Sequence, residues 1–288
     1  MSHHSRRHFL QFAGSTLATL GISQLNIQRQ AESYGKVLAQ STPRKLALLV
    51  GINDYSAQPL RGCVNDLELH RHLLIHRFGF NPKDIYTLTD KQATRQGILD
   101  AFEEHLIKQA KPGDVVVYHY SGHGSRVLDP NPLVVDPSKK GGTNGTFVPV
   151  DYGLIDEYSE EGGVVKDIMG HTFFLLMLAL KSENFTAVLD SCYSGGAIRE
   201  IRVRARDNKG KKLQISPKEK SYQDQWLSRL NLSPEDYVRL YRKGVAKGVV
   251  LAATNPNQTA IDMPFNDFHV GAFTYLLTQY LWQQPPRF

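Results

Sequence analysis

The chain has 288 residues, of which 41% are hydrophobic and 22% are charged, a composition typical of one globular domain with a full hydrophobic core. No run of about 18 apolar residues occurs, so the sequence does not predict a transmembrane helix. Its two cysteines are too few for a secreted disulfide scaffold, so a packed core must hold the fold.

The net charge of +6 is unevenly distributed along the chain. Residues 1–39 carry about +3, residues 199–220 carry about +6, and all the others together carry about −3. A protein that binds a nucleic-acid backbone spreads its basic residues over one face and interleaves them with aromatic ones. The sequence therefore does not predict a nucleic-acid partner.

The first 39 residues differ from the rest of the chain. Two arginines, Arg6 and Arg7, precede a mildly apolar stretch that reaches Ile22. The sequence Val37-Leu38-Ala39 resembles the small-residue cleavage site at the end of a signal peptide. This pattern is similar to a twin-arginine export signal and predicts a periplasmic or extracytoplasmic protein, which would stay cytoplasmic if the leader were not recognised. A disordered basic leader is the alternative. In both interpretations the folded domain spans 40–288.

Apolar runs alternate with helical patterns along this domain. The predicted strands are 45–52, 85–88, 115–120, 147–150, 185–189 and 248–253. The predicted helices are 64–78, 94–107, 169–180, 234–242 and 271–281. This alternation predicts an α/β fold with a mainly parallel central sheet, helices on both faces, and ligands at the carboxyl ends of the strands.

Two of the predicted strands end in residues that suit nucleophilic catalysis. The strand at 115–120 leads into Ser121-Gly122-His123-Gly124, and the strand at 185–189 leads into Asp190-Ser191-Cys192. A buried cysteine or histidine alone more often belongs to the packing. Together, at adjacent strand ends, the imidazole and the thiol can meet, and a nearby imidazolium favours the thiolate. The pair predicts a hydrolase.

These motifs resemble those of the caspase-like cysteine peptidases, and within that group the metacaspases and their prokaryotic relatives, the orthocaspases. The resemblance extends from about residue 45 to the C-terminus and includes the blocks 48–55, 60–66 and 271–277. It implies the caspase-like (caspase-hemoglobinase) fold, Cys192 as nucleophile and His123 as its partner. It also implies an oxyanion hole formed by the N–H groups of Gly124 and Cys192, and a monomer.

The resemblance further implies a pocket for the residue that precedes the cleaved bond. Caspases that cut after aspartate line this pocket with arginines, whereas metacaspases place acids there, here Asp66 and Asp190, with Cys63 and Ser121 beside them. Two carboxylates in one pocket repel each other until a cation arrives, and a substrate arginine or lysine supplies it. Without the resemblance, Asp66 would be interpreted as a helix cap and Asp190 as a strand-end hydrogen-bonding residue.

The basic segment at about 199–220 contains bonds after Arg or Lys that an enzyme of this specificity could cleave in its own chain. It is polar enough to be mobile, so we expect autoprocessing there; a solvated loop is the alternative. The candidate residues are Arg199, Arg202, Arg204, Arg206, Lys209, Lys211 and Lys212, followed by Lys218 and Lys220.

Many metacaspases require calcium, which clustered aspartates bind, and this sequence departs from that pattern. Residues 141–146 read Gly-Gly-Thr-Asn-Gly-Thr where an acidic run would stand, and a later Asp-Asp pair is reduced to Asp167-Ile168. Calcium takes about six to eight oxygen ligands. We therefore predict no metal ligand, no required cofactor and no strict dependence on calcium, with calcium activation left open.

Together these patterns predict a cysteine endopeptidase that cuts protein or peptide substrates after Arg or Lys. Two alternatives stay open, an aspartate-specific caspase activity and a catalytically silent caspase-like scaffold that binds partners through the same cleft. The first requires pocket arginines, which the motif positions lack. The second is disfavoured by the intact Cys/His pair.

Overall fold

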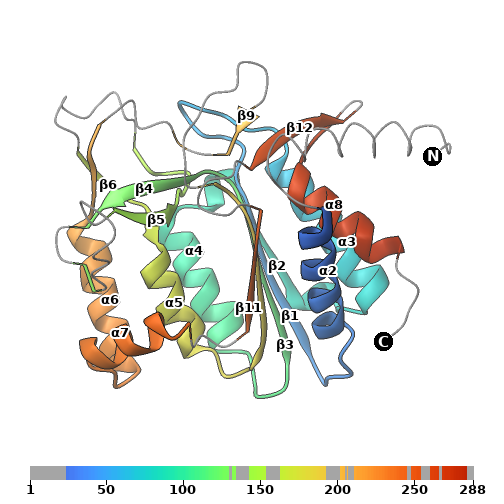
Figure 1. Cartoon of the computed structure of the whole chain (residues 1–288), viewed down its shortest axis with the longest axis horizontal. Coiled ribbons are helices and arrows are strands. Elements are labelled where there is room, and N and C mark those ends of the chain that lie inside the picture. Colours follow the sequence, from blue (N-terminus) through green and yellow to red (C-terminus); the bar gives the residue numbers. More distant parts are fainter. Residues whose placement is uncertain are drawn as a thin grey trace.

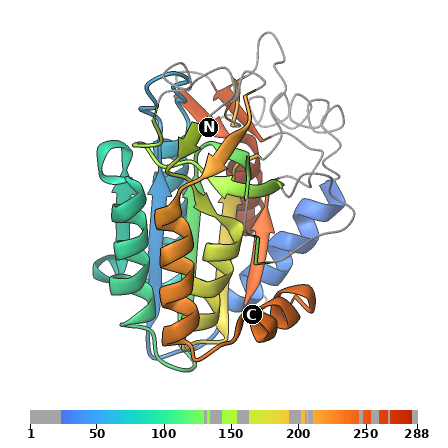
Figure 2. The same ribbon diagram turned by 90° about the vertical axis from the view of Figure 1, so that its left-hand side faces the viewer.

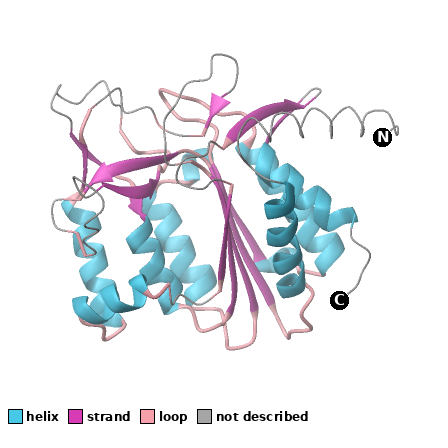
Figure 3. Ribbon diagram, in the orientation of Figure 1, coloured by secondary structure: helices cyan, strands magenta, loops and turns pink. Residues whose placement is uncertain are grey.

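The structure is a computed structural model, and a five-stranded parallel sheet lies at its centre with helices on both sides (Figure 1, Figure 3). It describes residues 24–129, 132–133, 143–153, 163–192, 202–204, 206, 211–244, 248–253, 260–265 and 268–283. The predicted α/β class with a mainly parallel central sheet is confirmed. No described helix combines the length and apolar character that a membrane-spanning helix needs.

The central sheet explains the continuous apolar runs of the sequence. Its strands, in spatial order, are β11 (Val249–Ala252), β8 (Asn184–Asp190), β3 (Val115–Ser121), β1 (Lys45–Gly51) and β2 (Ile85–Thr89). All neighbours run parallel. The middle strands are buried on both faces, so alternating polar residues are not needed.

Two groups of helices cover the two faces of this sheet (Figure 1). One group is α2 (Gln24–Leu38), α3 (Cys63–Phe78) and α8 (Ala272–Gln283). The other is α4 (Arg95–Ala101), the π-helical turn η3 (Phe102–Ile107), α5 (Gly170–Ala179), α6 (Pro217–Arg229) and α7 (Pro234–Arg242). A hydrophobic core lies on each face of the sheet, and successive β1 residues point into opposite cores. Leu48 packs with the second group of helices and Leu49 with the first.

Two smaller sheets lie near the end at which the central strands finish (Figure 2). One contains β6 (Gly163–Val165), β10 (Leu213–Ile215), β4 (Gly124–Leu128), β5 (Thr143–Phe147) and β7 (Ile168–Met169). The other contains β13 (Phe268–Gly271), β12 (Ile261–Phe265) and β9 (Arg202–Val203). The short 3₁₀ turns η1 (Pro82–Asp84) and η2 (Asp90–Gln92) flank β2.

The strand predicted at 147–150 is wrong in position. The strand β5 ends at Phe147, and the residues after it form loop contacts, with the Val148 N–H donating to the His123 carbonyl over 3.0 Å. The Val150 N–H donates to the Ala93 carbonyl at the same distance. Burial of this apolar stretch therefore comes from the packing of a loop across the sheet edge and not from strand pairing.

Helix α2 falls inside the segment that the sequence assigns to an export signal. Ala31, Tyr34 and Leu38 are buried in the core beneath α3 and α8, and the Tyr34 hydroxyl lies 2.7 Å from His70 Nε2. A chain that began at residue 40 would lose these contacts. The twin-arginine motif itself lies outside the described residues, and export stays a prediction.

Candidate active site

The carboxyl ends of three central strands form one row. The strand register pairs Gly51 with Ser121 and Ser121 with Asp190, so β1, β3 and β8 finish side by side. His123 lies two residues beyond the end of β3, and Cys192 lies two residues beyond the end of β8. Parallel strands therefore bring the predicted Cys/His pair to one edge of the sheet.

His123 is held in one orientation by its surroundings. Its Nε2 lies 2.7 Å from the Gln58 carbonyl, which can only accept a hydrogen bond, so Nε2 carries the proton and Nδ1 holds the lone pair. Nδ1 is buried and has no hydrogen-bond partner in the described part of the chain. Burial lowers the pKa of His123 to about 4, against the opposing effect of the Gln58 carbonyl. The imidazole is therefore a neutral base at pH 7.

Two backbone N–H groups beside this histidine converge on one carbonyl oxygen. The Gly124 N–H and the Cys192 N–H donate to the carbonyl of Arg204 over 3.0 and 3.1 Å. Gly124 and Cys192 approach so closely that a Cβ on Gly124 would lie 2.3 Å from the Cys192 carbonyl oxygen. Only glycine fits at position 124 without displacing this backbone.

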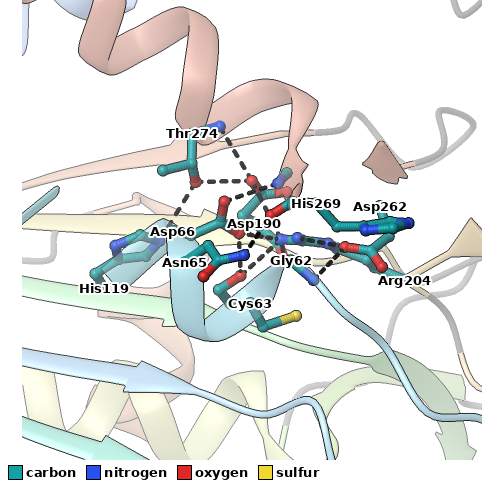
Figure 4. Close-up of polar contacts among 12 residues, drawn as sticks. Gly62, Cys63, Asn65, Asp66, His119, Asp190, Arg204, Asp262, His269 and Thr274 are labelled. Carbon is teal, nitrogen blue, oxygen red and sulfur yellow. Dashed lines mark hydrogen bonds and ion pairs between the residues drawn. The ribbon is translucent and has the colours of Figure 1, made fainter. Parts of the chain in front are cut away.

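The side chain of Arg204 is fully buried among three carboxylates (Figure 4). Its Nη1 lies 2.7 Å from Asp66 and 3.3 Å from Asp190, and its Nη2 lies 3.1 Å from Asp262. Nη1 also donates to Ser121 Oγ over 2.6 Å, and that hydroxyl donates to Asp66 over 2.6 Å. A single guanidinium thus pairs with all three of these buried carboxylates.

Residues 45–200 match the family described as metacaspase, peptidase C14 domain. The chain belongs to the metacaspase family. Metacaspase-1 of Schizosaccharomyces pombe is 28% identical over 84% of this chain and 61% of its own length. Metacaspase-1 of Meyerozyma guilliermondii is 37% identical over 56% and 38%, and Metacaspase-1B of Aspergillus clavatus is 36% identical over 59% and 42%. The chain thus spans 38% to 61% of these relatives.

A solved structure shares the fold of this metacaspase. Protein GSU0716 of Geobacter sulfurreducens superposes with a TM-score of 0.52 at 23% identity, covering 85% of this chain and 90% of that chain. Together with the family match, this likeness confirms the predicted caspase-like architecture. The predicted family, one of cysteine peptidases, is likewise confirmed.

The acidic pocket of this metacaspase holds one cation, the guanidinium of the chain's own Arg204. Burial raises the pKa of Asp66 to about 7, with Asp190 contributing in the same direction, while the Arg204 guanidinium opposes the shift. Without that guanidinium, the buried carboxylates would repel one another and tend to take up protons. Any side chain at Gly271 would enter this pocket, since a Cβ there would lie 2.1 Å from Asp190 and 2.6 Å from Arg204.

A hydrogen-bonded chain supports the floor of the pocket. Thr274 at the start of α8 donates its N–H and its hydroxyl to Asp190 Oδ2 over 3.0 and 2.7 Å. Its Oγ1 lies 3.4 Å from Nε2 of His119, whose Nδ1 lies 2.7 Å from His70. His119 is fully buried, and burial lowers its pKa well below the usual value, so it packs as a neutral residue.

The structure brings most of the predicted site residues together. Gly124, which follows His123, and Cys192 meet at the Arg204 carbonyl, and Asp66, Ser121 and Asp190 surround the Arg204 guanidinium. Cys63 at the start of α3 is buried beside this pocket (Figure 4), and burial raises the pKa of its thiol well above the usual range. Cys63 therefore stays a neutral thiol.

The candidate self-cleavage residues differ in where they lie. Arg199 and Lys209 fall outside the described residues, as does the side chain of Arg202; Lys211 and Lys212 lie before β10 at the surface. Arg204 and Arg206 are buried, so the alternative of a solvated loop does not hold at these two positions, and self-cleavage in this segment stays a prediction. These two side chains are buried because each guanidinium finds a buried carboxylate.

Two parts of the site escaped the sequence-based reasoning. Asp262 lies outside every motif named in the sequence, yet it accepts from the N–H groups of Arg61 and Gly62 as well as binding Arg204. Asp167, noted in the sequence only for calcium, binds Arg206. A pairing of buried charges leaves no local pattern that a single sequence could reveal.

Proposed function

We propose that this metacaspase is a cysteine endopeptidase that cleaves after arginine or lysine, and that one of its substrates is its own Arg204–Ala205 bond. The observation that carries the proposal is the double anchoring of Arg204. Its carbonyl accepts from two backbone N–H groups beside Cys192 and His123, while its guanidinium fills the acidic pocket. A substrate residue preceding a scissile bond would bind in this way.

The backbone of the same segment supports a substrate-like position. Strand β9 pairs antiparallel with β12, and the Arg204 N–H donates to the Ala260 carbonyl over 3.0 Å. Extended peptides bind many proteins by adding a strand to an exposed sheet edge, where main-chain hydrogen bonds supply affinity and side-chain pockets supply specificity. Residues 202–204 make both kinds of contact.

The chemistry then follows from the groups around the Arg204 carbonyl. The Cys192 sulfur attacks the carbonyl carbon as His123 Nδ1 takes the thiol proton, and the oxygen becomes an anion bound by the N–H groups of Gly124 and Cys192. His123 passes its proton to the amine of Ala205, the C–N bond breaks, and a thioester remains on Cys192. Water then hydrolyses the thioester and restores the thiol.

Peptide cleavage tests the specificity. We expect fluorogenic peptides ending in Arg or Lys to be turned over at least about 100-fold faster than a peptide ending in Asp, because an aspartate would add a fourth negative charge to the pocket. The measurement is kcat/KM for each peptide in the presence of reductant. Preferential turnover of the Asp peptide would overturn the proposed specificity.

The proposed oxyanion hole predicts a large effect at Gly124. The substitution Gly124→Ala pushes the Cys192 backbone away and separates the two N–H donors, so kcat should fall roughly 10²- to 10³-fold. Gly170→Ala is the matched control, since a Cβ there meets its nearest heavy atom at 3.5 Å. Equal kcat values for the two variants would contradict the role given to the Gly124 N–H.

The raised pKa of Asp66 predicts a pH dependence of substrate binding. As the pH falls from about 8 to about 6, Asp66 takes up a proton and loses the charge that attracts a basic side chain, so KM for an Arg peptide should rise several-fold. In Asp66→Asn the KM should be high at all of these pH values. A wild-type KM that does not change with pH would contradict this prediction.

We also propose that calcium is not required. Among the described residues, no group of three or more His, Cys, Asp or Glu side chains is arranged to hold a metal ion. Asp167, which stands where the resemblance would put a calcium ligand, is bonded to Arg206 and Thr146 instead. A chelator should leave kcat/KM within about twofold of its original value, and a loss restored by added calcium would refute the proposal.

A further inference from the structure

A second basic residue of the same segment occupies a second built pocket. Arg206 is 4% exposed, and its guanidinium forms two parallel bonds to Asp167, Nη1 to Oδ1 over 2.7 Å and Nη2 to Oδ2 over 2.8 Å. This geometry is the one in which arginine recognises a carboxylate most selectively. Asp167 itself is fully buried.

The walls of this pocket come from separate elements of the fold. Ser125 of β4 accepts from Arg206 Nη2 over 3.0 Å, and the guanidinium lies 5.7 Å from the centre of the Tyr152 ring. Thr146 of β5 donates its hydroxyl over 2.6 Å to Asp167 Oδ2, the oxygen that also accepts from Arg206 Nη2, and this bond helps to orient the carboxylate. The pocket is therefore organised by residues outside the segment that fills it.

The position of this pocket relative to the Arg204–Ala205 bond is fixed by Gly124. The Gly124 N–H donates to the Arg204 carbonyl over 3.0 Å, and the Gly124 carbonyl accepts from the Arg206 N–H over 2.9 Å. One residue of β4 thus binds the chain on both sides of the bond. The carboxylate of Asp167 then meets the side chain two residues beyond the bond.

We propose that Asp167, with Ser125 and Tyr152, is a second specificity pocket, which selects arginine or lysine at the second residue after the cleaved bond in substrates of this metacaspase. The inference rests on the proposed function and extends it from one recognised residue to two. Cleavage of the Arg204–Ala205 bond separates Arg206 covalently from Arg204, and release of Arg206 leaves a buried carboxylate without a cation. Such a carboxylate attracts the next basic side chain strongly.

The competing explanation is that Asp167 serves only to position the chain's own segment. Peptides supplied in trans separate the two. We would use internally quenched peptides that share one Arg-Ala cleavage site. They differ only in the residue that follows the alanine, which is Arg, Lys, Ala or Glu. The measured quantity is the ratio of kcat/KM between peptides for one enzyme preparation, because this ratio does not depend on the active fraction.

For the wild-type chain we expect the Arg peptide to exceed the Ala peptide in kcat/KM by roughly 10- to 100-fold, and the Glu peptide to be the poorest. In Asp167→Asn the ratio of Arg to Ala should fall to about 1. The matched control is Asp151→Asn, which removes a carboxylate that pairs with Lys166, next to Asp167 in the chain. Its ratio should equal that of the wild type.

The outcomes separate this inference from the proposed function. If no peptide with Arg before the bond is cut, the proposed function fails. If all four peptides are cut with equal kcat/KM by the wild-type chain, the function stands and the second pocket is refuted. Should Asp167→Asn not fold, Ser125→Ala replaces it: this variant removes one hydrogen bond to Arg206, and the ratio should fall roughly 3- to 10-fold. An unchanged ratio in that variant would also refute the pocket.

Discussion

Replacing Cys192 with alanine should lower both peptide turnover and self-cleavage by roughly 10⁴-fold or more, because the variant lacks the thiol proposed to form the covalent intermediate. The prediction rests on where Cys192 lies in the site as well as on its being a cysteine. The N–H of Cys192 already binds the carbonyl of Arg204, so the sulfur belongs to the residue that anchors the reacting group. Initial rates with an Arg peptide and the amount of intact chain on a gel measure the two effects.

The second cysteine provides the comparison for Cys192→Ala. Cys63 is buried, and burial keeps its pKa far too high for it to act as a thiolate. Cys63→Ser should therefore retain more than about a tenth of the wild-type kcat, with KM as the parameter that changes. Substantial turnover by Cys192→Ala, in a sample that melts at the wild-type temperature, would show that the nucleophile lies elsewhere.

The core of the fold could be predicted because its elements carry strong local patterns. The runs that became β1, β3 and β8 are apolar throughout, as buried parallel strands require. Strand β4 was missed because it is short and carries Arg126, which is exposed. Helix α6 was missed because the charged run Lys218-Glu219-Lys220 fills its first turn, although Ser216 caps it and Pro217 begins it.

The candidate site likewise contains residues that local sequence patterns predict and residues that only the tertiary fold reveals. His123 and Cys192 lie two residues beyond the ends of β3 and β8, both predicted as strands, so the sequence places them at one edge of the sheet, and the register pairs the last residues of those two strands, Ser121 and Asp190. The basic segment carries nine Arg and Lys residues that are equivalent as charges in the sequence. What distinguishes Arg204 is its burial against Asp66, Asp190 and Asp262, which come from three distant parts of the chain. Contacts of this kind depend on the tertiary fold.

In the proposed function, the uncut chain fills its own substrate cleft. Arg204 occupies the acidic pocket and Arg206 occupies the pocket of Asp167, so a peptide supplied in trans must compete with a segment that is covalently attached. Attachment at both ends gives that segment a high effective concentration, which would fall once cleavage between the two arginines leaves each of them attached at one end only. Self-cleavage would then convert an occupied cleft into one that is open to other substrates.

The substitution Arg204→Gln should prevent cleavage at residue 204, with the rate falling roughly 10³-fold or more, because glutamine has no charge to offer the buried carboxylates. Intact mass and N-terminal sequencing after incubation would detect the fragment that begins at Ala205. Lys212→Gln is the matched control, since Lys212 is exposed in the same segment, and it should be cut at the wild-type rate. The same Ala205 fragment from Arg204→Gln would contradict the assignment.

The stability of the uncut Arg204→Gln chain provides an independent readout of the pocket. Loss of the guanidinium removes a charge that lowers the pKa of Asp66, so this pKa, already raised by burial in the folded wild-type chain, should rise further above its value in the unfolded chain. The folded state then binds more protons than the unfolded state, and its stability falls as the pH rises. The variant should melt at a lower temperature at about pH 8 than at about pH 5.5, relative to Cys192→Ala, which keeps Arg204 in place. An identical pH dependence of melting in the two variants would mean that Arg204 does not neutralise these carboxylates.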